Sequence, residues 1–332
     1  MLYVTTRNKH DTYTVHHVMQ KDRGEDGGLF QPFHLLPFDR EELMELGRQT
    51  FGQRVAKILN LFFSARLTGW DVDFCVGKSP VKLAPLSHRI LVAECWHNPD
   101  HTFGRIEKSL CERICGQTVE KPTAWMAIAV RIAVLFGIYG DLLAVEAVRP
   151  EKPLDVAVPA GDFTAPMAVW YAREMGLPIG NVICCCDENS GLWDLLHHGE
   201  VRCDCELPRN LERLVNLTLG VEETLRYCES CEKGRTFATR PGMLERLREG
   251  MYAYVVSSQR QESLIPSVYR TGGMILGLES AQSYGGLLDY RAKTGESRPA
   301  LLLAELSPVL DKKVVAAAMD ISEQELLRQL GE

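Results

Sequence analysis

The sequence predicts an α/β protein in which helices flank a mostly parallel sheet. The pattern is clearest from Leu154 to Asn189, where an apolar run, a glycine-containing turn, an amphipathic stretch ending at Gly176 and a second apolar run follow one another. This order is typical of a β-α-β unit. Apolar runs at Leu91–Trp96 and Ala300–Ala304 predict further buried strands.

Composition and charge narrow the class of protein. The chain has 332 residues, 45% of them apolar and 24% charged, as in globular proteins long enough for two lobes or one large elaborated domain. A net charge of -7 and a pI of about 5.8 argue against nucleic acid or a membrane as the partner. The sequence shows no signal-peptide pattern and no apolar run of about 18 residues. We therefore expect a cytoplasmic protein, and its oligomeric state stays open.

In the first third of the chain, patterns predict four regular elements and one stretch that crosses the surface. A strand at Leu2–Thr6 precedes a glycine turn and an extended segment ending at Pro32. Asp39, followed by acidic residues, is a helix N-cap, and apolar residues at helical spacing predict a helix at about 52–66. Residues 67–90, rich in proline and glycine, are expected to cross the surface.

The rest of the chain alternates helices with strands. Residues 124–143 hold only two charges, Arg131 and Asp141, which predicts a buried helix. Ser322 and Glu325 match a capping box at the start of a C-terminal helix. The other elements predicted are a helix beginning near Ile106, helices at 192–198, 211–227 and 242–249, a strand at 251–256 and a helix opening at Ser280.

The turn at 159–166 is the first candidate binding site. In a β-α-β unit the N–H groups at the start of the helix are unpaired, and the helix dipole adds partial positive charge. Ligands of such sheets collect at this point. We expect the turn to favour a small anion, either a phosphate or a carboxylate.

A second candidate site follows the predicted strand at 91–96. His97, Asp100 and His101 lie within five residues, which suits acid/base chemistry or metal binding. The alternative is that Asn98-Pro99-Asp100 forms a turn with both histidines in solvent. The sequence leaves both readings open.

The chain contains eleven cysteines, and four of them form a third candidate site. Cys184, Cys185 and Cys186 lie on a predicted strand, where side chains alternate between faces, and are expected to fill the core. Cys203 and Cys205, with Cys228 and Cys231, supply the two thiol pairs that a structural zinc site needs. Those pairs meet only if the intervening helical stretch folds back. The alternative is a set of buried or surface thiols.

Several motifs resemble those of threonine synthase, a pyridoxal-phosphate enzyme of fold type II. The most specific are Tyr-Val-Thr-Thr-Arg at 3–7 and Asp-Gly-Gly-Leu-Phe-Gln-Pro at 26–32. Similar stretches follow at 156–163, 175–179, 195–199 and 302–308. The resemblance implies a threonine-synthase-like segment at 1–90 and the α/β core of the large lobe at 91–332.

The resemblance also exposes departures from the family. Gly104 stands where the family has its Schiff-base lysine, and Lys108 lies one helical turn further on. Only residues 115–123 fill the interval that holds the family's small mobile lobe, so we expect that lobe to be missing.

The family's phosphate turn corresponds to Ala160, Gly161, Asp162, Phe163 and Thr164, with an acid replacing an amide at Asp162. A carboxylate beside a phosphate is unfavourable because like charges repel. Glu305 stands at the position where the family has the residue that faces the pyridine nitrogen of the cofactor. Together with the five residues of the turn, it forms the expected remnant of a cofactor site.

We therefore expect a protein that has lost threonine synthesis and that binds a small anionic metabolite or a partner in the old cleft. We expect no bound cofactor, although the resemblance leaves pyridoxal phosphate open and the cysteine pairs leave zinc open. One alternative is an active enzyme of the family, or one with altered chemistry using His97, Asp100, His101 or Lys108. The other is a zinc- or thiol-dependent interaction protein.

Overall fold

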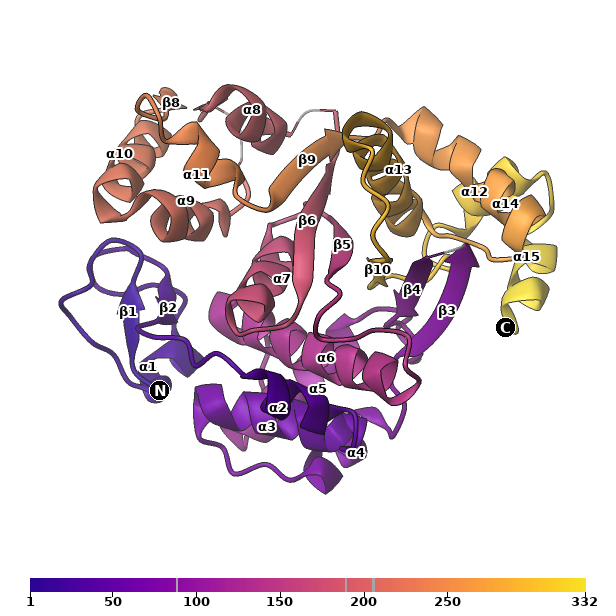
Figure 1. Cartoon of the computed structure of the whole chain (residues 1–332), viewed down its shortest axis with the longest axis horizontal. Coiled ribbons are helices and arrows are strands. Elements are labelled where there is room, and N and C mark those ends of the chain that lie inside the picture. Colours follow the sequence, from indigo (N-terminus) through magenta and orange to yellow (C-terminus); the bar gives the residue numbers. More distant parts are fainter. Residues whose placement is uncertain (88, 189, 205–206) are drawn as a thin grey trace.

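The core of the protein is a six-stranded sheet, shown by a computed structural model that describes residues 1–87, 89–188, 190–204 and 207–332. The strand order is β3-β4-β10-β5-β6-β9 (Figure 1). Five strands are parallel, and only the edge strand β3 runs antiparallel to its neighbour β4. The bounds are β3 Lys82–Ser87, β4 Ile90–Glu94, β5 Leu154–Pro159, β6 Ile179–Cys186, β9 Met251–Val255 and β10 Ala300–Ala304. The predicted α/β class is confirmed.

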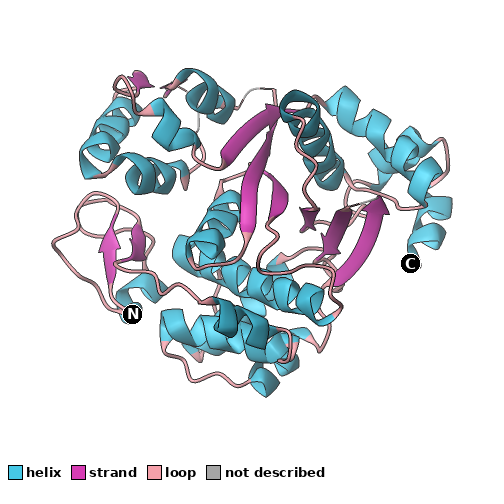
Figure 2. Cartoon of the chain, in the orientation of Figure 1, coloured by secondary structure: helices cyan, strands magenta, loops and turns pink. Residues whose placement is uncertain are grey.

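Helices cover both faces of this sheet (Figure 2). One face packs against α3 Phe51–Phe63, α6 Ala124–Ala144 and α7 Thr164–Glu174. The other packs against α12 Ser258–Gly272, α13 Leu278–Thr294, α14 Lys312–Met319 and α15 Glu323–Leu330. The sequence did not predict α12 or α14.

The strand residues alternate between these two cores. Cys184 and Cys186 belong to the first core and Cys185 to the second, and all three are buried. Successive side chains of a strand point to opposite faces. The expectation that the cysteine triplet fills the core is confirmed.

The helix α6 is the centre of the first core. It is the one described helix that is long and apolar enough to cross a membrane, but 78% of its apolar stretch is buried inside the protein. It packs between α3 and α7. The prediction of a buried helix at 124–143 is confirmed.

The N-terminal region forms a separate two-stranded sheet from β1 Tyr3–Thr5 and β2 Phe30–Pro32. Asp39 caps α2 Arg40–Leu46 in a capping box with Glu42. The fully buried Arg213 donates to the carbonyl oxygen of Phe30, and this contact links β2 to α9 Leu211–Leu219. The remaining helix here is α1 Val15–Gln20.

The stretch at 67–90, which was expected to cross the surface, contains a helix and a strand that the sequence did not predict. Thr68 and Asp71 form a capping box that begins α4 Gly69–Val76. The helix was hidden from pattern analysis because Trp70 and Phe74 are exposed, so its apolar residues do not mark the buried face. The strand β3 follows it and completes the edge of the sheet.

The segment between β6 and β9 forms a small helical layer. Its two-stranded sheet is β7 Glu200–Arg202 with β8 Thr236–Ala238. The predicted helix at 211–227 is two helices, because Gly220 adopts a φ of 90° that breaks it. The helices are α8 Gly191–His198, α9 Leu211–Leu219, α10 Val221–Glu232 and α11 Leu244–Arg248.

Candidate functional site

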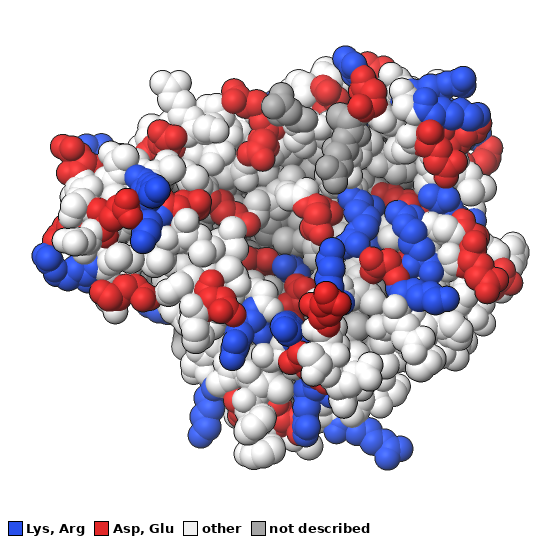
Figure 3. Space-filling view, turned by 180° about the vertical axis from the view of Figure 1, so that it is seen from behind, with Lys and Arg blue, Asp and Glu red and all other residues white. Residues whose placement is uncertain are grey.

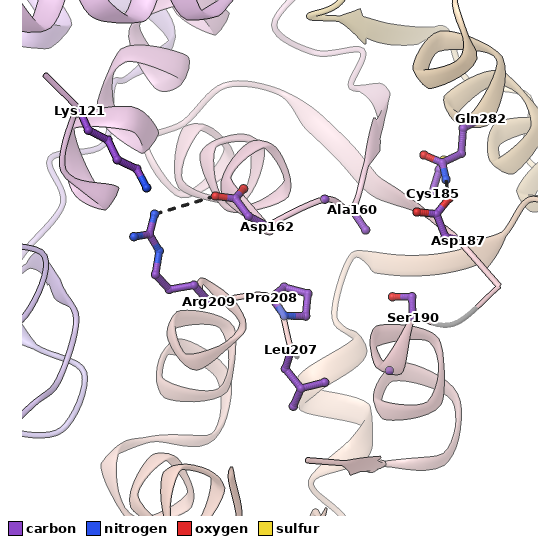
Figure 4. Close-up of a pocket in the computed structure, with 12 residues that line it drawn as sticks. Lys121, Ala160, Asp162, Cys185, Asp187, Ser190, Leu207, Pro208, Arg209 and Gln282 are labelled. Carbon is purple, nitrogen blue, oxygen red and sulfur yellow. Dashed lines mark hydrogen bonds and ion pairs between the residues drawn. The ribbon is translucent and has the colours of Figure 1, made fainter. Parts of the chain in front are cut away.

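A cleft of about 740 Å³ opens at the carboxyl ends of β5 and β6. The predicted phosphate turn forms one wall, and Lys121 comes from the loop between α5 Gly104–Cys115 and α6. Figure 4 shows Lys121, Arg209 and Asp162 at one end and Asp187, Gln282 and Ser190 at the other. The turn that the sequence singled out therefore does line a cavity.

The turn already uses several of the N–H groups that would hold an anion. Thr164 N–H donates to Oδ1 of Asp162 at 2.9 Å. The N–H groups of Ala160 and Phe163 donate to the carbonyl oxygens of Cys185 (2.8 Å) and Ala160 (2.7 Å). The carboxylate of Asp162 thus takes a place at the N-terminus of α7 that an external anion would otherwise take.

Arg209 brings positive charge to the same end of the cleft. Its Nη2 lies 3.9 Å from Oδ2 of Asp162, and its Nη1 lies 2.9 Å from Oδ2 of Asp22. Lys121 points toward Arg209 (Figure 4) and makes no ion pair within the described parts of the chain. Lys121 is therefore the cation that is available to a ligand.

The opposite end of the cleft is acidic. Gln282 Nε2 donates to Oδ1 of the exposed Asp187 at 2.7 Å. On the face of the molecule seen in Figure 3, acidic and basic side chains are interspersed, without a large patch of one sign. A small ligand is a better match for this surface than a polyanion.

The position expected to hold the catalytic amine does not reach the cleft. Gly104 is the exposed first residue of α5, and a Cβ there would meet only Oγ1 of Thr102, at 3.3 Å. Lys108 is exposed on the same helix. Neither residue lines the cleft.

Glu305 is bound by an arginine of the chain itself. Arg131 Nε and Nη2 donate to the two carboxylate oxygens of Glu305, both at 2.8 Å, and Nη1 pairs with Glu107. The guanidinium also lies over the ring of Phe103, 4.7 Å from its centre. Burial lowers the pKa of Arg131, but Glu305 and Glu107 outweigh it and raise that pKa. These three charged side chains form a closed ion cluster.

Next to this cluster lies Glu279, which sequence patterns did not single out. Burial, and then the charge of Glu305, raises the pKa of Glu279 to about 8. Its Oε2 is buried without a hydrogen-bond partner among the described residues. A glutamate in the first turn of a helix is typically solvated there, so nothing in the sequence marked it.

The three polar residues after β4 have separate partners. His97 Nε2 lies 3.6 Å from Glu94, Asp100 lies 3.8 Å from Arg105, and His101 Nδ1 lies 3.7 Å from Glu332. Burial lowers the pKa of His97. The structure does not gather His97, Asp100 and His101 into one acid/base or metal site.

Three of the four cysteines proposed as zinc ligands do come together. Because α10 folds back beside α9, Cys203, Cys228 and Cys231 line one pocket, with the thiols of Cys203 and Cys231 3.3 Å apart. Cys205 lies outside the described residues. Among those described, no three His, Cys, Asp or Glu side chains are arranged to hold a metal ion.

Pyridoxal phosphate does not fit these residues as the resemblance implies. Position 104 offers no amine, Glu305 is held by Arg131, and the carboxylate of Asp162 occupies the turn. A closed ion pair has no free carboxylate for a pyridinium, and a carboxylate repels a phosphate.

Comparisons with known proteins agree with the motifs. Residues 2–79 match the family model "Threonine synthase N terminus". "Threonine synthase-like 1" of Pongo abelii and of Homo sapiens are both 28% identical over 153 residues. That match covers 42% of this chain and 21% of each relative, so the chain spans only part of these proteins.

Solved structures show the fold over nearly the whole chain. PLP-bound threonine synthase of Brucella melitensis superimposes with a TM-score of 0.83 at 16% identity, covering 97% of this chain and 92% of the other. Yeast threonine synthase superimposes with a TM-score of 0.81 at 13% identity, covering 96% of this chain and 90% of the yeast chain. The predicted resemblance to threonine synthase is confirmed, and the fold is that of fold type II.

Proposed function

We propose that this threonine-synthase-like chain has lost pyridoxal-phosphate-dependent threonine synthesis and serves as a scaffold that binds a small anionic metabolite. The observation that carries the proposal is the bidentate pair between Arg131 and Glu305. The residue that corresponds to the family's contact with the cofactor ring is engaged by the chain itself.

The missing amine supports the same conclusion. The family's chemistry starts with a covalent bond to a lysine amine, and Gly104 offers no nucleophile. Lys108 does not line the cleft, so it does not replace that amine. Without the nucleophile the reaction has no first step.

The short connection between α5 and α6 is the second support. Only residues 116–123 join the two helices, and they contain no helix or strand. The resemblance places the family's mobile lobe in this interval. A cleft without that lobe stays open to water, which such chemistry must exclude.

Binding of an anion rests on the cationic end of the cleft. Lys121 makes no ion pair with any described residue, and Arg209, which pairs with Asp22 at 2.9 Å, lies 3.9 Å from Asp162. Two cations within one cavity favour a ligand that carries a carboxylate or a phosphate. Asp162 limits the affinity, because it places a negative charge beside the ligand.

A threonine assay tests the loss of activity. The purified chain, supplied with pyridoxal phosphate and O-phosphohomoserine, is expected to form no threonine above the rate without enzyme. The variant Gly104→Lys is expected to stay inactive as well, because the ion cluster and the open cleft remain. Threonine formation by the unaltered chain would refute the proposal.

Replacing Asp162 by asparagine is expected to strengthen binding of inorganic phosphate at least about fivefold. Removing one like charge near a bound anion is worth at least ~1 kcal/mol. Calorimetric titration with phosphate measures the change. The control is Asp194→Asn, which makes the same change of charge at an exposed site of α8 outside the cleft. Equal affinities for the Asp162 variant and the unaltered chain would show that the cleft is not the anion site.

One observation favours a second candidate, an enzyme with altered chemistry in the same cleft. Lys121 places an amine at the same end of the cleft as Asp162 of the phosphate turn (Figure 4). An amine in this position is the kind of group that covalent catalysis uses. The two candidates differ in whether Lys121 forms a covalent bond with an aldehyde ligand.

A further inference from the structure

The thiols of Cys203 and Cys231 lie side by side in the helical layer between β6 and β9. Cys203 directly follows β7, and Cys231 lies in the last turn of α10. Their sulfur atoms are 3.3 Å apart, and both residues are free cysteines. We propose that this pair is a site of oxidation, at which a peroxide joins the two thiols in a reversible disulfide.

The pair can be reached from solvent. A pocket of about 230 Å³ opens onto both thiols, between α10 and the loop that precedes α9. Cys203 is buried, whereas Cys231 is partly exposed. A small oxidant therefore meets Cys231 first, and Cys203 lies behind it as the resolving thiol.

Cys228 has a different environment, although it lines the same pocket. Its charged neighbours are Glu212, Arg7 and Arg23, which act on its pKa after burial. The neighbours of Cys231 are Cys203, Tyr227 and Cys228, and the thiol in contact with it is that of Cys203, at 3.3 Å. The geometry thus selects Cys231 as the partner of Cys203, and Cys228 serves as a matched control from the same helix.

The reaction balances with peroxide as the oxidant. The thiolate of Cys231 attacks one peroxide oxygen, breaks the O–O bond, and becomes a sulfenic acid while the other oxygen leaves as hydroxide. The thiolate of Cys203 then attacks that sulfur, the S–S bond forms, and the second oxygen leaves as hydroxide. Each hydroxide takes up a thiol proton, so two thiols and one peroxide give one disulfide and two waters.

The oxidation is expected to be slow at neutral pH. Burial and the contact with Cys203 raise the pKa of Cys231 to about 12. Because only the thiolate reacts, the rate is expected to rise about tenfold per pH unit below that pKa. The groups that face Cys231 across the pocket are Cys203, Tyr227, Cys228, Arg7, Glu212 and Glu232.

The disulfide would close a loop that contains α9 and α10. Such a bond lowers the conformational freedom of the unfolded chain. Leu207, Pro208 and Arg209 lie in this loop and line both the thiol pocket and the anion cleft. Oxidation would therefore fix one wall of the cleft.

Peptide mapping of the whole chain after peroxide treatment tests the inference. One linked peptide pair that joins the Cys203 and Cys231 segments is expected, and it should disappear after reduction with dithiothreitol. The temperature of unfolding is expected to rise on oxidation and to return on reduction. In denaturant, the number of titratable thiols should fall from eleven to nine.

Three variants separate this site from other thiols. Cys203→Ser and Cys231→Ser are expected to lose the linked pair, whereas Cys228→Ser should keep it. No linked pair in the unaltered chain, or a pair that survives in Cys203→Ser, would overturn the inference. Near-stoichiometric zinc in the purified protein would also overturn it, because metal-bound thiolates would then explain the cluster. If a variant does not fold, peptide mapping of the unaltered chain still shows whether Cys203 and Cys231 form a disulfide.

Discussion

Replacing Arg131 by methionine is expected to lower the free energy of unfolding by about 3–5 kcal/mol. The substitution leaves Glu305 and Glu107 in a largely buried position without their shared cation. Breaking a buried ion pair from one side is costly because the remaining charge stays desolvated. Denaturation with urea, monitored by circular dichroism, measures the difference.

The control for Arg131 is an exposed ion pair elsewhere in the chain. Arg328→Met removes the partner of Glu325 on the C-terminal helix α15, where Arg328 is largely exposed. Exposed pairs contribute about 0–1 kcal/mol. If both variants lost equally little stability, the cluster around Arg131 would not be the internal support that we infer.

Glu279 is expected to make the protein less stable as the pH rises from about 4.5 to about 8. These limits are its ordinary pKa and the pKa raised by burial and by Glu305. Across this range the Glu279 carboxyl keeps its proton in the folded chain but has lost it in the unfolded chain. Stability therefore falls with pH, by roughly 1.4 kcal/mol per unit at most.

Glu279→Gln is expected to remove most of this slope, because glutamine does not titrate. Urea denaturation at several pH values between 4.5 and 8 measures the slope. Glu262→Gln, at an exposed site of α12, makes the same change of charge and should keep the slope. A slope that persists unchanged in the Glu279 variant would show that another group is responsible.

Much of the fold could be predicted because strands of a parallel sheet are continuous apolar runs. The run at β5 and the one at β6 gave the β-α-β unit directly. The missed helix α4 and the break at Gly220 depend on tertiary contacts and on one backbone angle. Neither leaves a mark in apolar periodicity.

The site was only partly predictable for a similar reason. The turn around Asp162 has a local pattern, and the structure places it at a cleft. Lys121 and Arg209 come from loops, and Arg131 meets Glu305 across a separation of 174 residues. Contacts between residues so far apart in the sequence are determined by the fold. Sequence patterns therefore identified Glu305 but not Arg131, which forms the ion pair with it.

The most direct test of the proposed loss of function is covalent trapping with pyridoxal phosphate. The purified chain is incubated with the cofactor, reduced with borohydride and digested, and every modified lysine is mapped and quantified. We expect only low, scattered modification of exposed lysines, equal to that of the chain unfolded in urea. A stoichiometric adduct on Lys121 or Lys108 that is lost on unfolding would contradict the account and establish a cofactor-binding amine.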